Sequence, residues 1–283
     1  MSNPKVSIIY VDYNTQGLLE NSLQSLIRSK PSFRYDVIVV VNGSSNFDAP
    51  RVKRLLPKTT IVHAAKNLGF GGGNNLGAEK ASGEYLWLLN TDTLVPTGSN
   101  MDEVVNWLES HHEYAAATPL LVNAKGQEQS AQVGHFPALW RMILEKPVGL
   151  LGRLLPALDS LARGLSPRYV PKSSTDVDQA VAASLVVRKS AFKEVDGFSK
   201  EYFFFYEDTD LCRKFSEQGL RVRFVRDAKV VHLLGGSIAS QYERKQRYYI
   251  AQDIYFLKWK SLVSRVGVKV LRAPLIMWHK VRG

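Results

Sequence analysis

The sequence predicts an α/β fold in which a mostly parallel β-sheet is flanked by helices. Continuous apolar runs of strand length alternate with helical patterns over the first 120 residues, and polar turn residues follow the strands. Parallel strands have continuous apolar sequences because helices cover both faces of their sheet. The chain has 283 residues, 45% of them hydrophobic, which is enough for one large core.

The first elements are predicted from the start of the chain. Residues 6–11 form an apolar strand, and residues 15–29 carry leucines and an isoleucine at helical spacing. Further strands are expected at residues 37–41, 59–63 and 85–89. A glycine-rich turn, within residues 67–77, and then a helix through Leu76 and Ala78 are expected between the last two of these strands.

Polar side chains follow three of these predicted strands. In chain order they are Asp12, Tyr13 and Asn14, then Asn42, then Asn90, Thr91 and Asp92. Ligands of such sheets bind at the carboxyl ends of the strands. The three groups are therefore expected to converge on one rim.

The second half of the chain has a different pattern. Residues 135–174 are rich in proline, apolar and basic residues, and they are expected to form a partly helical insertion on the acceptor side of the site. Sheet-like sequence resumes at residues 177–187, and two short strands are expected at residues 221–225 and 229–232.

The most informative stretch is residues 202–213, where an aromatic run precedes Glu207, Asp208 and Asp210 at the start of an amphipathic segment. One interpretation is a helix capped by an acidic residue, with Leu211 and Phe215 in the core. The other is a carboxylate beside aromatic rings whose pKa suits proton transfer. Asp92, far upstream, favours the second interpretation, because two separated acidic motifs suggest one cleft built from two loops.

Cysteine content and hydropathy suggest the compartment. Cys212 is the single cysteine, so no intramolecular disulfide framework is possible and a reducing compartment is expected. The first residues lead directly into a strand, and no window has about 18 uninterrupted apolar residues. We therefore expect a cytoplasmic protein, peripheral on the cytosolic face of the inner membrane.

The net charge of +11 is concentrated in residues 241–283, where ten Lys or Arg residues face two acidic ones. A basic segment implies a polyanionic partner. Apolar residues and tryptophans such as Trp259 and Trp278 are interleaved with these charges, which favours an anionic membrane surface over nucleic acid. Gly267 and Pro274 are expected to divide the segment into two short helical pieces. The alternative is a C-terminal helix that packs on the domain.

The glycine-rich run at residues 67–77 lacks the Gly-Lys-Ser/Thr of a P-loop and follows the third strand, so a Rossmann cofactor site is disfavoured. This run belongs to a set of motifs that also includes the polar groups above, Gly197, Phe198, Glu207, Asp208 and residues 232–237. In their order and spacing, these motifs resemble a bacterial family 2 glycosyltransferase of the GT-A fold. The resemblance covers roughly residues 5–240, which we expect to form the GT-A domain (1–240), followed by the basic helical segment (241–283). Within the family it is most similar to the rhamnosyltransferase-like branch that builds surface polysaccharides such as O-antigen.

The resemblance implies a role for each matching residue. Asp12, Tyr13 and Asn14 would border the nucleoside, and Asn42 would contact the base. Asn75, Asn90 and Thr91 would line the nucleotide-sugar, with Asn90 standing where the family has the first Asp of an Asp-x-Asp element. Asp92, with His232 as a further contact, would bind Mg²⁺ or Mn²⁺. Asp208, second in the pair Glu207-Asp208, would be the general base.

The resemblance thus implies a metal-dependent inverting glycosyltransferase. It would move a sugar, rhamnose from dTDP-rhamnose being the expected one, to a lipid-linked or growing glycan acceptor. The first alternative is a sugar nucleotidyltransferase, which would need a basic glycine-rich loop directly after the first strand, where residues 12–17 stand instead. The second is a non-catalytic membrane-associated scaffold, which would have no need of Asp92 or Asp208.

Overall fold

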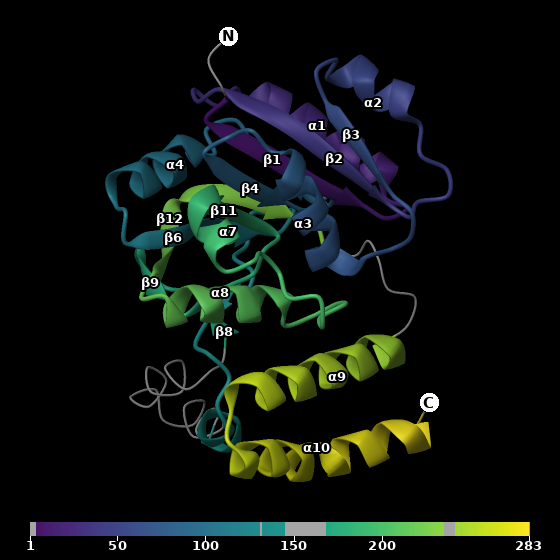
Figure 1. Cartoon of the computed structure of the whole chain (residues 1–283), viewed down its shortest axis with the longest axis vertical. Helices are drawn as coiled ribbons and strands as arrows, with labels where there is room; N and C mark the ends of the chain where they lie inside the picture. Colours follow the sequence, from purple (N-terminus) through teal and green to yellow (C-terminus); the bar gives the residue numbers. More distant parts are fainter. Residues whose placement is uncertain (1–3, 131, 145–167, 235–240, 283) are drawn as a thin grey trace.

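The computed structural model describes residues 4–130, 132–144, 168–234 and 241–282 (Figure 1). Most of the expected insertion, at residues 145–167, lies outside the described residues, as do residues 235–237 of the last motif. Within the described ranges, nine strands form one central sheet with helices on both of its faces, so the predicted architecture is confirmed.

The first half of the chain alternates strands and helices as the sequence predicts. Its elements are β1 (Val6–Asp12), α1 (Gln16–Ser29), β2 (Tyr35–Asn42), α2 (Ala49–Leu55), β3 (Thr60–Ala64), α3 (Gly69–Lys80), β4 (Tyr85–Leu89), β5 (Thr93–Leu94), α4 (Met101–Ser110), β6 (Tyr114–Val122) and β7 (Val133–Gly134).

The second half adds short strands and the longest helices. Its elements are β8 (Arg168–Tyr169), β9 (Thr175–Val177), β10 (Gln179–Ala180), β11 (Ser184–Arg188), α7 (Lys189–Glu194), α8 (Glu207–Glu217), β12 (Arg221–His232), α9 (Gln241–Trp259) and α10 (Leu262–Arg282).

The strand order places the polar turns at one edge. The order is β3-β2-β1-β4-β11-β6-β12-β5, with β9 also paired to β12. Strands β3, β2, β1 and β4 are parallel, whereas β11 runs antiparallel between β4 and β6. The carboxyl ends of β1, β2 and β4 therefore meet at the same edge.

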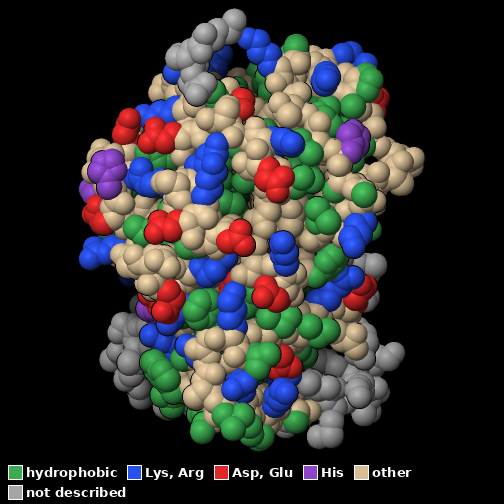
Figure 2. Space-filling view, viewed as in Figure 1, with side chains coloured by type: hydrophobic (Ala, Val, Ile, Leu, Met, Phe, Trp, Pro, Cys, Tyr) green, Lys and Arg blue, Asp and Glu red, His purple; other side chains and the backbone are tan. Residues whose placement is uncertain are grey.

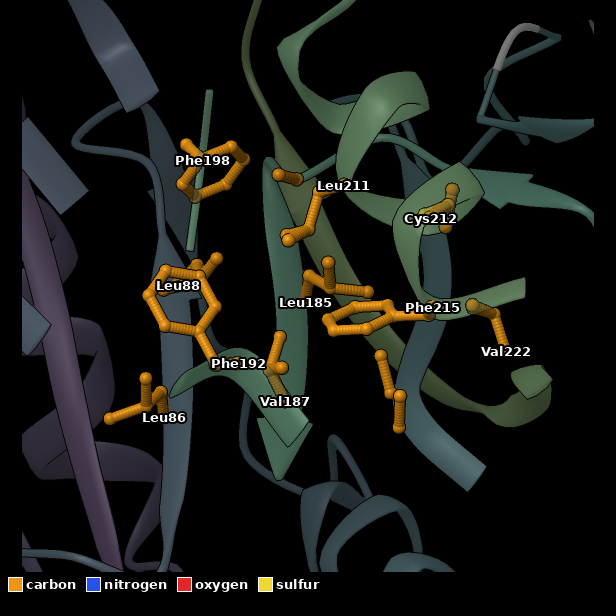
Figure 3. Packing of buried hydrophobic residues seen from close by; sticks show 14 of the residues in the cluster. Leu86, Leu88, Leu185, Val187, Phe192, Phe198, Leu211, Cys212, Phe215 and Val222 are labelled. Carbon is orange, nitrogen blue, oxygen red and sulfur yellow. The ribbon is translucent and has the colours of Figure 1, made fainter. Parts of the chain in front are cut away.

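Each face of the sheet has its own core. One cluster packs α1 and α4 on side chains such as Tyr10 and Trp87, and the other packs α3, α7 and α8 on the opposite face. Figure 3 shows Leu211 and Phe215 of α8 against Leu185 of β11, with Cys212 beside them. Leu211 and Phe215 are fully buried, as the capped-helix interpretation expected. No side-chain cap forms, however, because Tyr206 occupies the N-cap position.

The glycine-rich run is helix α3, and the prediction of a turn there is wrong. Its glycines allow the helix to approach the sheet closely: a Cβ on Gly73 would lie 2.5 Å from Val11 Cγ1, and one on Gly77 would lie 2.5 Å from Ile9 Cγ2. Packing on β1 therefore outweighs the low helix propensity of glycine.

The strands predicted at residues 221–225 and 229–232 are a single strand. β12 continues through both segments beside β6, and its register shifts between Val225 and Lys229. Residues 226–228 of β12 pair with no residue of β6 at this shift, and they interrupt the alternation that the sequence pattern shows.

The basic C-terminal segment forms two helices, but the break is not where the sequence suggested. α10 runs through both Gly267 and Pro274, and the chain turns instead between Trp259 and Leu262. Gly267 serves packing, since a Cβ there would lie 2.5 Å from Leu139 Cδ2.

Helix α9 packs on the domain, as the alternative interpretation proposed. Tyr255 and Phe256 of α9 form a buried cluster with Tyr202 and Tyr206, which precede α8. In Figure 1, α9 lies between α8 and α10. The C-terminal helices are thus attached to the part of the chain that carries Glu207 and Asp208.

We predict that Gly73→Ala destabilises the protein by about 1–3 kcal/mol, because the added methyl group overpacks the contact with Val11. The matched control is Gly17→Ala in α1, where a Cβ would meet no atom within 4 Å. The control should be neutral or stabilising by about 0.5 kcal/mol. Urea unfolding of both variants measures the difference, and equal stabilities would contradict the packing role assigned to Gly73.

Candidate functional site

Asp12 joins the three polar strand ends into one rim. Its side chain is fully buried at the end of β1; Ser44 donates to Oδ2 at 2.5 Å and the Thr15 hydroxyl donates to Oδ1 at 2.9 Å. The Thr15 hydroxyl also lies 2.9 Å from that of Thr91, after β4. The predicted convergence is therefore confirmed.

Tyr13 and Asn14 form the outer part of this rim. Asn14 adopts a left-handed backbone conformation (φ 55°); its N–H donates to Ser44 Oγ, and its side-chain oxygen accepts from Ser45 N–H. The Tyr13 ring is exposed beside this turn. Tyr13 is thus the exposed residue of this turn and Asp12 lies beneath it, whereas the nucleoside contacts predicted for both stay predictions.

The amide groups of Asn42 and Asn75 bond to the protein itself. Asn42 donates to Asn67 Oδ1 and to Gly69 O, both at 3.1 Å, and accepts from Leu68 N–H at 2.9 Å. Asn75 pairs with both backbone groups of Phe198, each at 2.8 Å. Both side chains position α3 and its neighbouring loops, whereas their predicted ligand contacts stay predictions.

Asp92 and His232 meet because β5, which follows Asp92, pairs with the end of β12. His232 Nε2 lies 3.4 Å from Asp92 Oδ1, and both side chains are largely buried. Gln129, which the sequence analysis did not single out, donates its amide to His232 O at 2.6 Å. Its oxygen then faces His232 Nδ1 at 3.1 Å.

This arrangement sets the hydrogen-bonding state of the imidazole. The Gln129 amide oxygen can only accept, so Nδ1 of His232 donates to it and Nε2 points toward Asp92. An imidazole and a carboxylate are both groups that ligate divalent cations. Within the described ranges no group of three or more His, Cys, Asp and Glu side chains could hold a metal ion. A cation here would need its other ligands from a bound phosphate or water, as Mg²⁺ sites commonly do.

Glu207 and Asp208 begin α8 in different environments. Asp208 lies 3.7 Å from the Arg168 guanidinium of β8. Glu207 is buried, and its Oε2 has no hydrogen-bond partner. Burial, and next the charge of Asp208, raises the pKa of Glu207 to about 8. At neutral pH the buried Glu207 carboxyl is therefore mostly protonated.

The turn before α8 is strained. Phe205 and Tyr206 have φ of 72° and 65°, a conformation that bulky residues rarely adopt. The Tyr206 hydroxyl accepts from Gln252 Nε2 at 3.0 Å and lies 3.2 Å from the Tyr248 hydroxyl, so α9 holds the turn in place.

Asp210 ties α8 to the end of α9. Its fully buried carboxylate accepts from Trp259 Nε1 at 2.7 Å and lies 3.0 Å from Lys258 Nζ. The indole N–H of Trp259 is therefore bound inside the protein. Asp210 belongs to this junction, which leaves Glu207 and Asp208 as the acidic candidates for chemistry.

The two acidic motifs are attached to one short segment. The Thr209 hydroxyl donates to Gln179 Oε1, and Asn90 N–H donates to Ala183 O at 2.9 Å. Ala183 is four positions after Gln179 in the chain, a span of at most about 14 Å. A molecule of modest size lying along this segment could contact both motifs. Gln129, Arg168 and Gln179 stand in no recognisable spacing, so the sequence alone does not identify them as part of the site.

Comparisons with known proteins agree with this geometry. A family model described as "Glycosyl transferase family 2" matches residues 7–152, and one described as "Glycosyl transferase family group 2" matches residues 169–281. Rhamnosyltransferase WbbL of Escherichia coli (strain K12) is 26% identical over 278 residues, which cover 92% of this chain and 95% of WbbL. The N-acetylglucosaminyl-diphospho-decaprenol L-rhamnosyltransferase of Mycobacterium tuberculosis (strain CDC 1551 / Oshkosh) is 25% identical over 238 residues, 80% of this chain and 75% of that protein.

Among solved structures, the chain is similar to GalNAc-T7 in complex with UDP, GalNAc and Mn²⁺, with a TM-score of 0.63 and 14% identity. The match covers 90% of this chain and 48% of GalNAc-T7, so the chain spans about half of that protein. The likeness confirms the expected GT-A-type fold.

We predict that Glu207→Gln removes a pH dependence of stability. The pKa of Glu207 is raised from its ordinary value of 4.5 to about 8 in the folded protein. Its stabilising contribution is therefore fully present below about pH 4.5 and declines as the pH rises through about 8. Glutamine mimics the protonated acid and cannot ionise, so the decline should be shallower in the variant.

Urea unfolding from pH 5 to pH 9 measures this slope. Glu217→Gln, at the other end of α8 and half-exposed, is the control and should unfold with the wild-type slope. An unchanged slope in Glu207→Gln would mean that Glu207 is already ionised in the folded protein.

Proposed function

Because the chain belongs to glycosyl transferase family 2 and is a nucleotide-sugar-dependent glycosyltransferase, we propose that it transfers rhamnose from dTDP-rhamnose with inversion at the anomeric carbon. The proposed acceptor is a lipid-linked or growing surface-polysaccharide glycan. The names of the two rhamnosyltransferase relatives support this donor sugar, and the mycobacterial name, with its diphospho-decaprenol, supports a lipid-linked acceptor.

One observation carries the proposal: the Asp92–His232 pair and the Glu207–Asp208 pair are attached to the same short segment. The donor would lie along the rim formed by Asp12, Tyr13 and Thr91. Asp92 and His232 would hold Mg²⁺ or Mn²⁺, and the bound ion would neutralise the diphosphate leaving group. The Asp92 carboxylate and the oriented imidazole of His232 offer an oxygen and a nitrogen ligand for such an ion.

Asp208 would act on the acceptor side. The acceptor hydroxyl oxygen forms a bond to the anomeric carbon while its proton passes to the Asp208 carboxylate. The bond from the anomeric carbon to the diphosphate breaks, and the nucleoside diphosphate leaves. Arg168 would balance the charge of Asp208, and the protonated Glu207 would leave Asp208 as the single anion of the pair.

Family membership favours this activity over both alternatives. A sugar nucleotidyltransferase would need a basic glycine-rich loop after β1, but residues 12–17 form the polar turn around Asp12. A non-catalytic scaffold would have no use for a buried acid beside a second carboxylate, an arrangement that is costly to maintain.

We predict that the protein releases nucleoside diphosphate from dTDP-rhamnose faster than from UDP-, GDP- or other dTDP-sugars when a lipid-linked glycan is present. Asp208→Asn should lower transfer by about 10²- to 10⁴-fold, because a positioned base is lost. Its affinity for the nucleotide should stay near that of the wild type. A panel of donors assayed by nucleotide release tests both statements, and near wild-type transfer in the variant would remove Asp208 from the base role.

Asp92→Ala is the contrasting variant in the same experiment. It should lose the part of nucleoside diphosphate affinity that depends on Mg²⁺ or Mn²⁺, as measured by calorimetry with and without the ion. If affinity responds to the ion equally in wild type and variant, Asp92 does not hold it.

The proposal includes peripheral attachment to an anionic membrane on its cytosolic face. None of the helices in the described part of the chain is long and apolar enough to span a membrane. Helix α10 instead exposes an apolar surface that includes Val263 (76% exposed), Val266 and Val270, with Lys269 beside it. Figure 2 shows hydrophobic and basic side chains intermingled at the end of the molecule that α9 and α10 form. Such a mixture is typical of helices that lie in a membrane interface.

We predict that Val263→Glu combined with Val266→Glu weakens binding to vesicles that contain phosphatidylglycerol at least about tenfold, because burying each valine contributes about 1.5 kcal/mol or more. The control is Ile27→Glu, a partly exposed apolar residue of α1. Truncating α9 would be a poorer test, since it would remove Tyr255 and Phe256 from the core. Unchanged sedimentation of the double variant with vesicles would place the attachment elsewhere.

A further inference from the structure

We propose that the first half of α9 and the loop 203–206 together bind the diphosphate and first isoprene units of a lipid-linked acceptor. This acceptor-binding surface is defined by Phe203, Phe205, Arg244, Arg247 and Tyr248. The inference rests on the proposed function and adds to it the place where the lipid diphosphate lies.

The position of this surface points to the acceptor. The loop 203–206 leads directly into Glu207 and Asp208, and Figure 1 shows it reaching toward the start of α9. On its other side the loop touches α3: a Cβ on Gly69 would collide with the carbonyl oxygen of Phe203. A diphosphate bound at this surface would therefore lie beside the turn that leads into Asp208.

The chemistry of the surface suits an amphiphilic anion. The Arg247 guanidinium lies 5.2 Å from the centre of the Phe203 ring, and that of Arg244 lies 5.7 Å from the Phe205 ring. Phe203 and Tyr248 are 46% and 40% exposed. An arginine guanidinium can donate two hydrogen bonds to the oxygens of one phosphate group, and exposed aromatic rings can contact an apolar chain. The two features together therefore match a lipid diphosphate.

The present contacts of the two arginines are weak enough to be exchanged. Arg247 pairs with Glu243 one helical turn away, and both side chains are more than one-third exposed. Ion pairs of this kind contribute about 0–1 kcal/mol in water. Arg244 is exposed and lies against the Phe205 ring. A diphosphate could therefore recruit both guanidinium groups at little cost.

Two further features support a lipid. Helix α9 is fixed at its far end by the bonds of Lys258 and Trp259 to Asp210, so its arginines keep their place relative to Asp208. Ile250 and Leu257, seven residues apart on α9, are 61% and 64% exposed. Residues seven apart lie on the same face of a helix, so they form an apolar path from the arginines toward α10.

The test is direct binding of farnesyl diphosphate, measured by calorimetry in EDTA so that metal-dependent binding at Asp92 and His232 does not contribute. The wild type should bind farnesyl diphosphate more tightly than either farnesol or inorganic diphosphate. Arg244→Ala combined with Arg247→Ala should weaken that binding at least about tenfold, because charge-assisted hydrogen bonds are lost. Arg244→Lys combined with Arg247→Lys should give an intermediate affinity.

The control removes the same charge from elsewhere. Lys53→Ala combined with Arg54→Ala changes two exposed residues of α2 and should bind farnesyl diphosphate as the wild type does. Equal weakening in this control would show non-specific charge attraction and overturn the proposal. If inorganic diphosphate binds as tightly as farnesyl diphosphate, the surface is a phosphate site that does not recognise the lipid. If farnesol binds as tightly as farnesyl diphosphate, the surface is merely apolar. Either result would overturn the proposal.

Transfer assays separate this inference from the proposed function. The double alanine variant should raise the KM for a lipid diphosphate acceptor and leave transfer to a soluble glycan acceptor unchanged. Equal loss with both acceptors would overturn the assignment to the diphosphate and lipid. If the wild type transfers sugar to neither acceptor, the proposed function fails, whereas the binding measurement still decides the place of the lipid diphosphate.

Discussion

The site depends on the turn before α8, in which Phe205 and Tyr206 hold a left-handed backbone conformation. Such a conformation costs roughly 1–2 kcal/mol per residue, so surrounding contacts must hold it. They come from α9, where Gln252 and Tyr248 lie at the Tyr206 hydroxyl. The turn directs Glu207 inward and leaves Asp208 near Arg168. The difference between these two neighbouring carboxylates therefore begins in the backbone.

The same helix pair is joined by a buried charge. Asp210 is fully buried, and removing such a carboxylate from water is costly unless donors surround it. Here Ser199, Trp259 and Lys258 supply them. Because two of these donors come from the end of α9, the basic C-terminal segment is part of the structure that holds α8. The C-terminal segment, which the sequence suggested to be separate from the domain, thus stabilises the position of α8 in the site.

Apolar runs and helical spacing are enough to predict β1 to β4, helix α1 and the rim at Asp12, Asn42 and Asp92, because core burial imposes those patterns. Such patterns carry no signal for contacts made through single hydrogen bonds. Two examples are Gln129, which orients His232, and Gln179, whose side-chain oxygen accepts a hydrogen bond from the Thr209 hydroxyl. Both stand in ordinary polar sequence. The sequence did not predict a helix at the glycine-rich run for another reason. This helix is stabilised by packing on β1, and helix propensities do not include such tertiary contacts.

Cys212 lies in α8 four residues after Asp208, packed under the helix and almost without solvent exposure (Figure 3). Burial raises the pKa of its thiol to about 12, so almost no reactive thiolate exists in the folded protein at neutral pH. A thiol reagent can therefore modify the chain only when α8 separates from the sheet. Cys212 is the only cysteine in the sequence, so any labelling by the reagent reports on this one position. The labelling rate therefore measures how often α8, the helix that carries Asp208, separates from the sheet.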